Sequence, residues 1–218
     1  MLTKDYIMRM IDALIKVLEK LLLLKESKNY NGALDEIEKG TKELFGLDRK
    51  FINSISDTQL INMIGVSETL LVPNCYLLGV LFKEQAEIIK LQGNRGISLE
   101  MFERSFNFFS QGLQHSTTLI EPDHLFKINS VIESLGEAEI SIETEKNLIF
   151  YYEFIGKFDK AEDLIYDLID FDSKYIIDGI KFCERLLKKE DSALILGNLP
   201  REEITSSLSF LTSKLNNY

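Results

Sequence analysis

Apolar side chains recur at steps of three and four residues along most of the chain, and this period predicts helices. Residues 3–25 show the pattern most clearly, with an apolar face broad enough to contact two neighbouring helices. The centre of this face is formed by Ile7, Ile11, Leu14, Leu18 and Leu21. Residues 140–142 are a short stretch whose pattern also fits a strand. The pattern predicts an all-α protein.

Glycine, proline and capping residues divide the pattern into separate helices. Gly46 follows the last apolar residue of the second helix, Pro73 either starts or kinks a long one, and Pro200 can open the last. Three prolines and twelve glycines in 218 residues are too few for the many turns of a sandwich or barrel. The predicted helices cover residues 3–25, 31–45, 56–65, 67–92, 98–113, 123–135, 141–155, 157–169, 173–188, 191–196 and 200–215.

A recurring turn predicts that the helices form hairpins. Residues 156–161, Gly-Lys-Phe-Asp-Lys-Ala, have a glycine, an aromatic residue two positions later and a small residue five positions later. Segments that start at Lys28, Gly93 and Lys188 fit less closely, and the four starts are 65, 63 and 32 residues apart. Those steps are close to multiples of a tetratricopeptide repeat. We expect one domain over residues 1–218, a stack of antiparallel hairpins in a tetratricopeptide-repeat-like (TPR-like) right-handed array; an irregular bundle is the alternative.

Three short segments carry a family resemblance: Asp5–Ile11, Tyr30–Leu34 and Leu44–Asp48. Through them the chain resembles an uncharacterised family of bacterial tetratricopeptide-like helical proteins. The resemblance implies a helical fold and a Gram-positive bacterial source. It implies no activity, so no functional residue carries over. Lys28 and Arg95 stand where the repeat usually has glycine and an aromatic residue, so those units are expected to stack less regularly.

The charge of the chain argues against a nucleic-acid partner. The formal net charge is −10 at pH 7, whereas binding to a phosphate backbone depends on clustered Lys and Arg. Residues 133–172 hold twelve acids and three lysines, and residues 1–28 hold six basic groups and four acids. Solvated helix faces explain this distribution most simply. The alternatives are an acidic surface for a basic partner and an attraction between the two ends of the molecule.

Cysteine use and hydropathy predict the compartment. Cys75 and Cys183 lie far apart in apolar segments, so we expect reduced, buried thiols. Charged residues interrupt the first segment, which argues against a signal peptide and a membrane span. The expectation is a cytoplasmic protein that does not contact a membrane.

No catalytic, metal-binding or phosphate-binding pattern stands out. His115 and His124 flank a turn with Glu121 and Asp123, but this spacing matches no metal-binding signature. Residues 93–96 lack the lysine and the preceding strand of a phosphate loop. We therefore expect no catalytic residue, no cofactor, no metal and no enzymatic activity. An unfamiliar acid/base site around the two histidines and two acids is the alternative.

Aromatic residues form the densest feature of the sequence. Most of them are expected in the core, because Phe102 and Phe106 share a helix face. Phe108 lies on a different face, and one of the pair Tyr151 and Tyr152 is also expected to be exposed. These three residues are the candidate partner-binding residues.

A non-enzymatic protein or peptide interaction module with an unidentified partner is the leading hypothesis for function. It rests on analogy of fold. One alternative is a small-molecule or peptide sensor with an apolar internal pocket. Another is a self-associating structural protein, such as a homodimer formed through the broad apolar face of the first helix.

Overall fold

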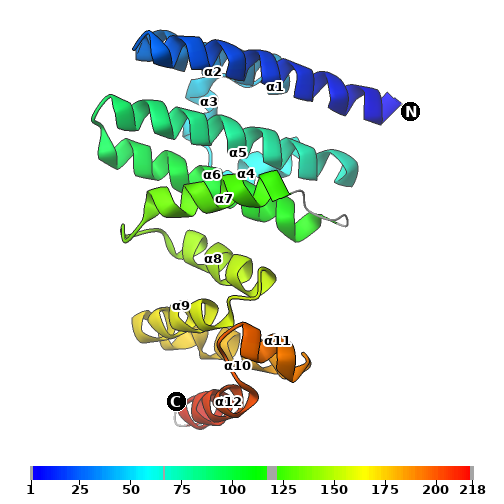
Figure 1. Cartoon of the computed structure of the whole chain (residues 1–218), viewed down its shortest axis with the longest axis vertical. Coiled ribbons are helices and arrows are strands. Elements are labelled where there is room, and N and C mark those ends of the chain that lie inside the picture. Colours follow the sequence, from blue (N-terminus) through cyan, green and yellow to red (C-terminus); the bar gives the residue numbers. More distant parts are fainter. Residues whose placement is uncertain (1, 66, 117–121, 217–218) are drawn as a thin grey trace. The chain divides into compact units, whose positions relative to one another are not determined.

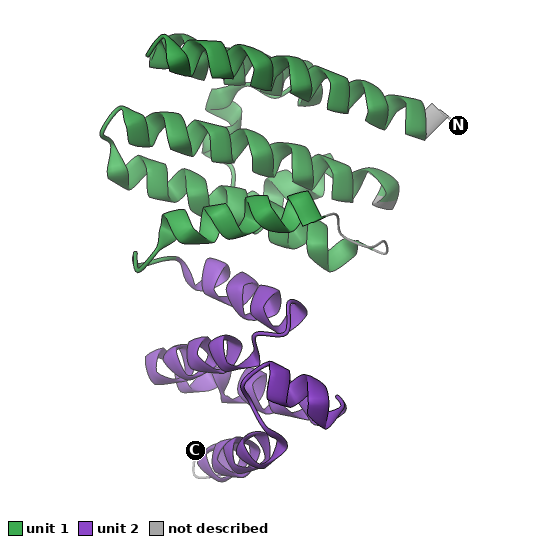
Figure 2. Ribbon diagram, in the orientation of Figure 1, with its two compact units in different colours: residues 1–140 green, residues 141–218 purple. Residues whose placement is uncertain are grey.

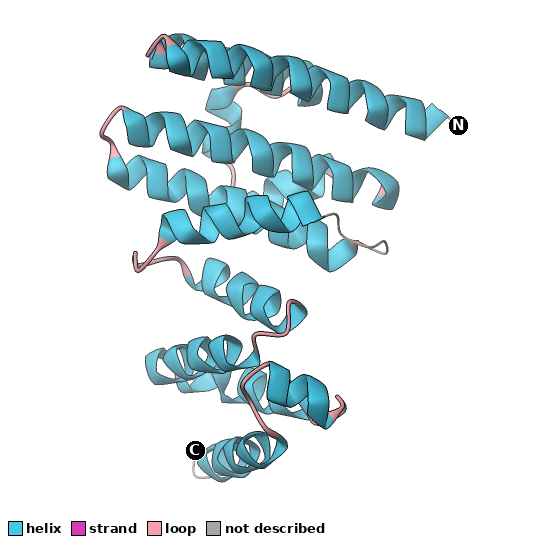
Figure 3. Ribbon diagram, in the orientation of Figure 1, coloured by secondary structure: helices cyan, strands magenta, loops and turns pink. Residues whose placement is uncertain are grey.

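The computed structural model describes residues 2–65, 67–116 and 122–216, and all regular structure in these ranges is helical (Figures 1 and 3). The prediction of an all-α protein is confirmed. The elements are α1 (Leu2–Glu26), α2 (Tyr30–Phe45), α3 (Arg49–Ser54), α4 (Asp57–Ile64), α5 (Glu68–Leu91), α6 (Arg95–His115), α7 (Pro122–Leu135), α8 (Ile142–Phe154), α9 (Phe158–Phe171), the 3-10 helix η1 (Ser173–Tyr175), α10 (Ile176–Leu186), α11 (Asp191–Leu196) and α12 (Arg201–Asn216).

Two compact units make up the chain, unit 1 with residues 1–140 and unit 2 with residues 141–218 (Figure 2). Unit 1 contains α1 to α7, and unit 2 contains α8 to α12 with η1. Each unit has its own arrangement of helices, and each is described by itself. The expectation of a single domain over residues 1–218 stays a prediction.

In unit 1, the closest helix pair is the hairpin of α5 and α6. The Ser105 hydroxyl donates to the Gly79 carbonyl oxygen at 2.7 Å, and the Ser98 hydroxyl donates to a second α5 carbonyl at 2.9 Å. A Cβ atom at Gly79 would lie 2.7 Å from the Phe109 ring, so only glycine permits this approach. Helix α1 packs on α2 and α5, and α7 packs on α6.

In unit 2, α8 packs on α9, and α10 packs on α9 and α12. The loop after α11 is tied to the start of α9, because the Asp159 N–H donates to the Gly197 carbonyl oxygen at 3.2 Å. The Asn198 side chain adds a second hydrogen bond, to the Asp159 carboxylate, also at 3.2 Å. A Cβ atom at Gly197 would lie 2.3 Å from the Phe158 ring. Contact this close requires glycine.

Three hairpin turns share one backbone geometry. Lys28, Gly93 and Gly156 have φ values of 55°, 85° and 75°, and in each case the next residue immediately precedes a new helix. Each turn has the two hydrogen bonds of the Schellman motif. The N–H groups of the following residues donate to carbonyls five positions back: Asn29 to Leu24, Asn94 to Ile89 and Lys157 to Tyr152. The predicted register of these three turns is therefore correct at the level of the backbone.

The fourth predicted turn, at Lys188, has a different geometry. Lys188 is not among the residues of the described chain with positive φ, whereas Asn198 has a φ of 55°. The pair of Schellman hydrogen bonds recurs at Asn198, with the Leu199 N–H donating to the Leu194 carbonyl. Asparagine tolerates the left-handed conformation better than lysine does. The motif thus recurs one helix later than predicted.

Several boundaries differ from prediction; α6, for example, begins at Arg95 and not at residue 98. Helix α3 was not predicted; it is a short helix whose first turn is capped by the Asp48 carboxylate, which accepts from the Phe51 N–H at 2.8 Å. Pro73 neither starts α5 nor divides it, but lies within its second turn. The ambiguous stretch at residues 140–142 contains the N-cap of α8, Ser141, whose hydroxyl accepts from the Thr144 N–H.

Candidate binding groove

A groove with a volume of about 750 Å³ lies in unit 2, with α8 along one wall and α10 along the other. Volumes of this order are typical of ligand sites. Side chains from α9 and η1 complete the lining. The lining residues are Lys146, Ile149, Phe150, Glu153, Phe154, Ile165, Leu168, Tyr175, Asp178, Lys181, Arg185 and Lys189.

The α8 wall exists because this helix carries two separate rows of packing residues. One row is buried and consists of Thr144, Asn147, Leu148 and Tyr151. The second row, Lys146, Ile149, Phe150, Glu153 and Phe154, follows the same three- and four-residue steps and lines the groove. Phe154 remains 48% exposed, so the groove presents an aromatic ring to solvent.

The α10 wall is polar. Helix α10 buries Gly179, Phe182, Cys183 and Leu186 and turns Asp178, Lys181 and Arg185 toward the groove. Lys189 follows in the turn after the helix. A cation is thus placed on each successive turn of this wall.

An ion pair joins the two walls. The Arg185 guanidinium donates to both carboxylate oxygens of Glu153, at 3.0 and 2.7 Å. This hydrogen bonding raises the pKa of Arg185 above its ordinary value. Two parallel bonds fix the relative orientation of the two side chains as well as their distance. The pair therefore holds α8 and α10 at a set separation.

The three lysines of the groove form no ion pair among the described residues, although a second acid, Asp178, also lines it. The Lys146 ammonium lies 4.6 Å from the centroid of the Tyr175 ring, a cation–π geometry. Within the described residues, no carboxylate lies within 4.0 Å of Lys146, Lys181 or Lys189. Of the twelve acids in residues 133–172, only Glu153 lines the groove. The groove is locally basic in a chain of net charge −10.

The predicted partner-binding residues lie elsewhere. The expectation that Phe108 is exposed is wrong: its side chain is fully buried, 5.4 Å from the Phe82 ring between centroids. Helix α6 contacts α4, α5 and α7, so the face that carries Phe108 is also covered. Tyr151 is fully buried as well, and Tyr152 keeps a partly exposed ring. A role of these three residues in binding stays a prediction.

The two histidines occupy different local environments. The His115 ring nitrogen Nδ1 lies 2.9 Å from the Gln111 carbonyl oxygen, at the exposed end of α6. The His124 ring lies against the Tyr76 ring in a tilted arrangement, with centroids 3.9 Å apart. Asp123 forms an ion pair with Lys127, and Glu121 lies outside the described residues. Where the structure describes the chain, no group of three or more His, Cys, Asp or Glu residues could hold a metal ion.

Both thiols are buried and free, as predicted. Burial raises the pKa of Cys75 to about 12 and that of Cys183 to about 11. Since the thiolate is the reactive form, neither residue is suited to nucleophilic chemistry in the folded chain.

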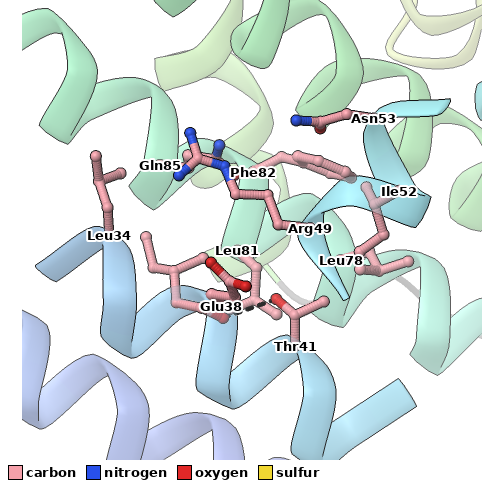
Figure 4. A pocket seen from close by; sticks show the side chains of 11 residues that line it. Leu34, Glu38, Thr41, Arg49, Ile52, Asn53, Leu78, Leu81, Phe82 and Gln85 are labelled. Carbon is pink, nitrogen blue, oxygen red and sulfur yellow. Dashed lines mark hydrogen bonds between the residues drawn. The ribbon is translucent and has the colours of Figure 1, made fainter. Parts of the chain in front are cut away.

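Unit 1 contains several further hollows, of which two differ sharply in size. One, about 650 Å³, lies among α1, α5, α6 and α7; its lining is mainly apolar, and Tyr76 and His124 supply polar groups. The other lies among α2, α3 and α5 (Figure 4) and measures about 30 Å³. That is room for about two water molecules. Apolar side chains such as Leu34 and Leu78 line it, and Glu38 and Arg49 contribute charged groups.

Comparison with known proteins gives a family and no function. None of the helices in the described ranges is long and apolar enough to cross a membrane. No curated protein and no solved structure shows significant similarity to the chain. Residues 1–216, however, match the family described as "Family of unknown function (DUF6483)", and the chain belongs to that family.

Proposed function

We propose that the chain is a non-enzymatic interaction module whose groove in unit 2 binds an acidic segment of a partner protein. The observation that carries the proposal is the set of three ammonium groups that form no ion pair within the described residues, beside the half-exposed Phe154 and the partly buried Phe150. Carboxylates of a partner would neutralise Lys146, Lys181 and Lys189, and its apolar side chains would cover Phe150 and Phe154.

The architecture supports this proposal. Hairpins with equivalent turns place helices side by side, and stacked helical repeats use the surface between helices for binding. We propose that the hairpins stack in the right-handed TPR-like manner, in a bacterial cytoplasmic protein. This part of the proposal rests on the shared turns and on the sequence resemblance.

Peptide binding tests the proposal directly. The probe is a fluorescein-labelled peptide library in which Asp or Glu alternates with Leu or Phe, measured by fluorescence anisotropy with the full chain. Two matched libraries replace each acid by lysine or each apolar residue by serine. We expect the acidic, apolar library to bind, and affinity to fall as salt increases.

A matched pair of variants locates the binding. Lys181→Glu/Lys189→Glu changes the groove, whereas Lys157→Glu/Lys188→Glu makes the same charge change at two exposed lysines outside its lining. We expect the groove variant to lose about tenfold or more in affinity and the control variant to lose far less. Equal losses, or preferential binding of the lysine library, would contradict the proposal.

The hollow of unit 1 supports a second candidate function, binding of an apolar small molecule. Its volume of about 650 Å³ and its mainly apolar lining are those of a ligand site. A medium-chain fatty acid series is a suitable probe, and thermal stabilisation is the measurement. Stabilisation that is lost in Ile11→Glu, a change at the edge of the hollow, would support this function over the first.

A further inference from the structure

Helix α1 carries an exposed apolar row in addition to the row that it buries. Its buried residues are Met10, Leu14, Val17 and Leu21. The second row is made by Met8, Ile11, Ile15, Leu18 and Leu22, at alternating steps of three and four residues. Four of these five side chains are 37% to 59% exposed. Steps of three and four are the pattern of a helix face that packs along another helix.

A row of acids runs beside this exposed apolar row. Asp5, Asp12, Glu19 and Glu26 recur at intervals of seven residues, and all four are exposed. Asp12, Glu19 and Glu26 each come four positions after a row member, Met8, Ile15 and Leu22 respectively, so the acids follow one edge of the row. In the part of the chain that the structure describes, no cation lies within 4.0 Å of these carboxylates.

The acid row disfavours pairing of α1 with the α1 helix of a second copy. Consider two copies of α1 that pack antiparallel through their exposed apolar rows and are related by a two-fold axis. The acid row of one helix then lies opposite the acid row of the other, along the same side of the contact. Asp12 and Glu19 would then face the acids of the other copy across the seam, and like charges in that position repel. In a parallel pair, the acids would face the opposite flank, which holds Leu14 and Leu21, and these are already buried in unit 1.

We propose instead that the exposed face of α1 docks in the groove of unit 2 of a second copy, an inference that rests on the proposed function of that groove. The two surfaces are complementary in chemistry. The apolar row would cover Phe150 and Phe154, and the acids would approach the ammonium groups of Lys146, Lys181 and Lys189. Docking of one surface on a different surface is head-to-tail, so assembly extends from copy to copy into a ring or an open chain.

The test measures self-association of the full chain with charge-swapped variants. The α1 swap is Asp5→Lys/Asp12→Lys/Glu19→Lys, and the groove swap is Lys146→Glu/Lys181→Glu/Lys189→Glu. Sedimentation velocity over a wide concentration range is the measurement, and circular dichroism checks that each variant folds. We expect the wild type to form a closed dimer or larger species at low salt and each swap alone to weaken association about tenfold or more.

Combining the swaps makes the test specific. In a mixture of the two variants, the groove of the α1-swapped chain is wild type and meets the wild-type α1 of the other chain, so association should return. A chain that carries both swaps should also self-associate, because both signs are reversed. Ile15→Ser, an uncharged change at an exposed position, should weaken assembly without altering charge.

Two outcomes would overturn the inference. One is a wild-type chain that stays monomeric at all concentrations while its groove binds the acidic peptide probe; this leaves the proposed function intact. The other is self-association that neither swap weakens, which places the interface elsewhere. Failure of the groove to bind the probe, in a chain that stays monomeric, would overturn the proposed function as well.

Discussion

The hollow of unit 1 and the groove of unit 2 are similar in volume, about 650 and 750 Å³, but differ in chemistry. The hollow is mainly apolar, and His124 is its one titratable nitrogen among the described residues. The groove combines aromatic rings with four basic side chains. Because their lining charges differ, the two sites suit different kinds of ligand. Neither the similar volumes nor the net charge of the whole chain would have revealed this difference.

Partly buried carboxylates of the two units differ in the direction of their pKa shifts. In unit 1, burial alone would raise the pKa of Glu87, but hydrogen bonds from Lys25 and Lys83 outweigh it and the pKa is lowered. In unit 2, burial raises the pKa of Glu162 and of Glu145. Ion pairs thus decide the shift of Glu87, whereas burial decides the shifts of Glu162 and Glu145.

The largest predicted effect comes from the core of unit 1. Phe108→Ala removes a fully buried ring and should lower the free energy of unfolding by about 3–5 kcal/mol. Phe126→Ala, at a 72% exposed position in the same unit, should change it by about 0.5 kcal/mol or less. Urea unfolding followed by circular dichroism measures both. Similar values for the two variants would contradict the burial of Phe108.

The next prediction concerns the anchor between α1 and α5. Lys25 donates to Glu84 at 2.6 Å and to Glu87 at 2.8 Å, and Lys25→Met should cost about 1–2 kcal/mol of unfolding free energy. Lys20→Met is the control, because the Lys20 side chain is 62% exposed in its ion pair with Glu36. Its effect should be much smaller than that of Lys25→Met, because solvent screens an exposed ion pair. Urea unfolding of the two variants measures both losses of unfolding free energy.

The pH dependence of the two units should differ in sign. The lowered pKa of Glu87 stabilises unit 1 above its ordinary value of 4.5, and this contribution is lost as the pH falls through the folded-state pKa. The raised pKa of Glu162 works in the opposite direction, because protonation removes the penalty for burying its charge. Acidification toward that raised pKa should therefore stabilise unit 2, whereas further acidification below 4.5 should destabilise unit 1.

Each unit contains one buried thiol, which makes this contrast measurable. Cys75 reports on unit 1 and Cys183 on unit 2. Urea titrations at several pH values, with a pyridyl disulfide reagent and identification of the labelled cysteine by mass spectrometry, follow the two units separately. Midpoints that move together with pH would contradict the predicted difference.

The smallest effect concerns the hairpin turns. Lys28 adopts a φ of 55°, which glycine adopts at lower cost, so Lys28→Gly should stabilise unit 1 by about 0.5–1 kcal/mol. Gly156→Ala, at a φ of 75° in unit 2, should destabilise that unit by about 1 kcal/mol. Thiol-resolved urea unfolding assigns each change to its unit. Destabilisation by Lys28→Gly would contradict the equivalence of the turns.

Local signals in the sequence predicted most of the fold. The three-residue and four-residue steps gave the helix type, and Gly93 and Gly156 marked two hairpin turns because glycine adopts positive φ readily. The turn at Asn198 has asparagine rather than glycine at its positive-φ position, and Lys28 departs from the motif, so backbone geometry was needed to show that these turns match. Short α3 carries too few residues for a period to be read.

The candidate groove could not be predicted because it depends on residues far apart in sequence. Glu153 and Arg185 are joined by hydrogen bonds across 32 positions, and neither is unusual in its local segment. Phe150 and Phe154 do form a second row on α8, a signal that the sequence contained. The sequence alone does not show which of the two rows of α8 is buried. The structure shows that the row containing Tyr151 is the buried one.

The bonds between Gly197, Asn198 and the start of α9 have a consequence for how unit 2 folds. Stacked repeats that contact only their neighbours can unfold piece by piece from an end. Here the segment after α11 is tied back to the first turn of α9, 39 positions earlier in the case of Asn198 and Asp159. Fraying of the carboxyl-terminal helices would disturb Phe158 at the base of the first hairpin. Unit 2 should therefore lose its structure in a single cooperative step, with similar hydrogen-exchange protection in α9 and α10.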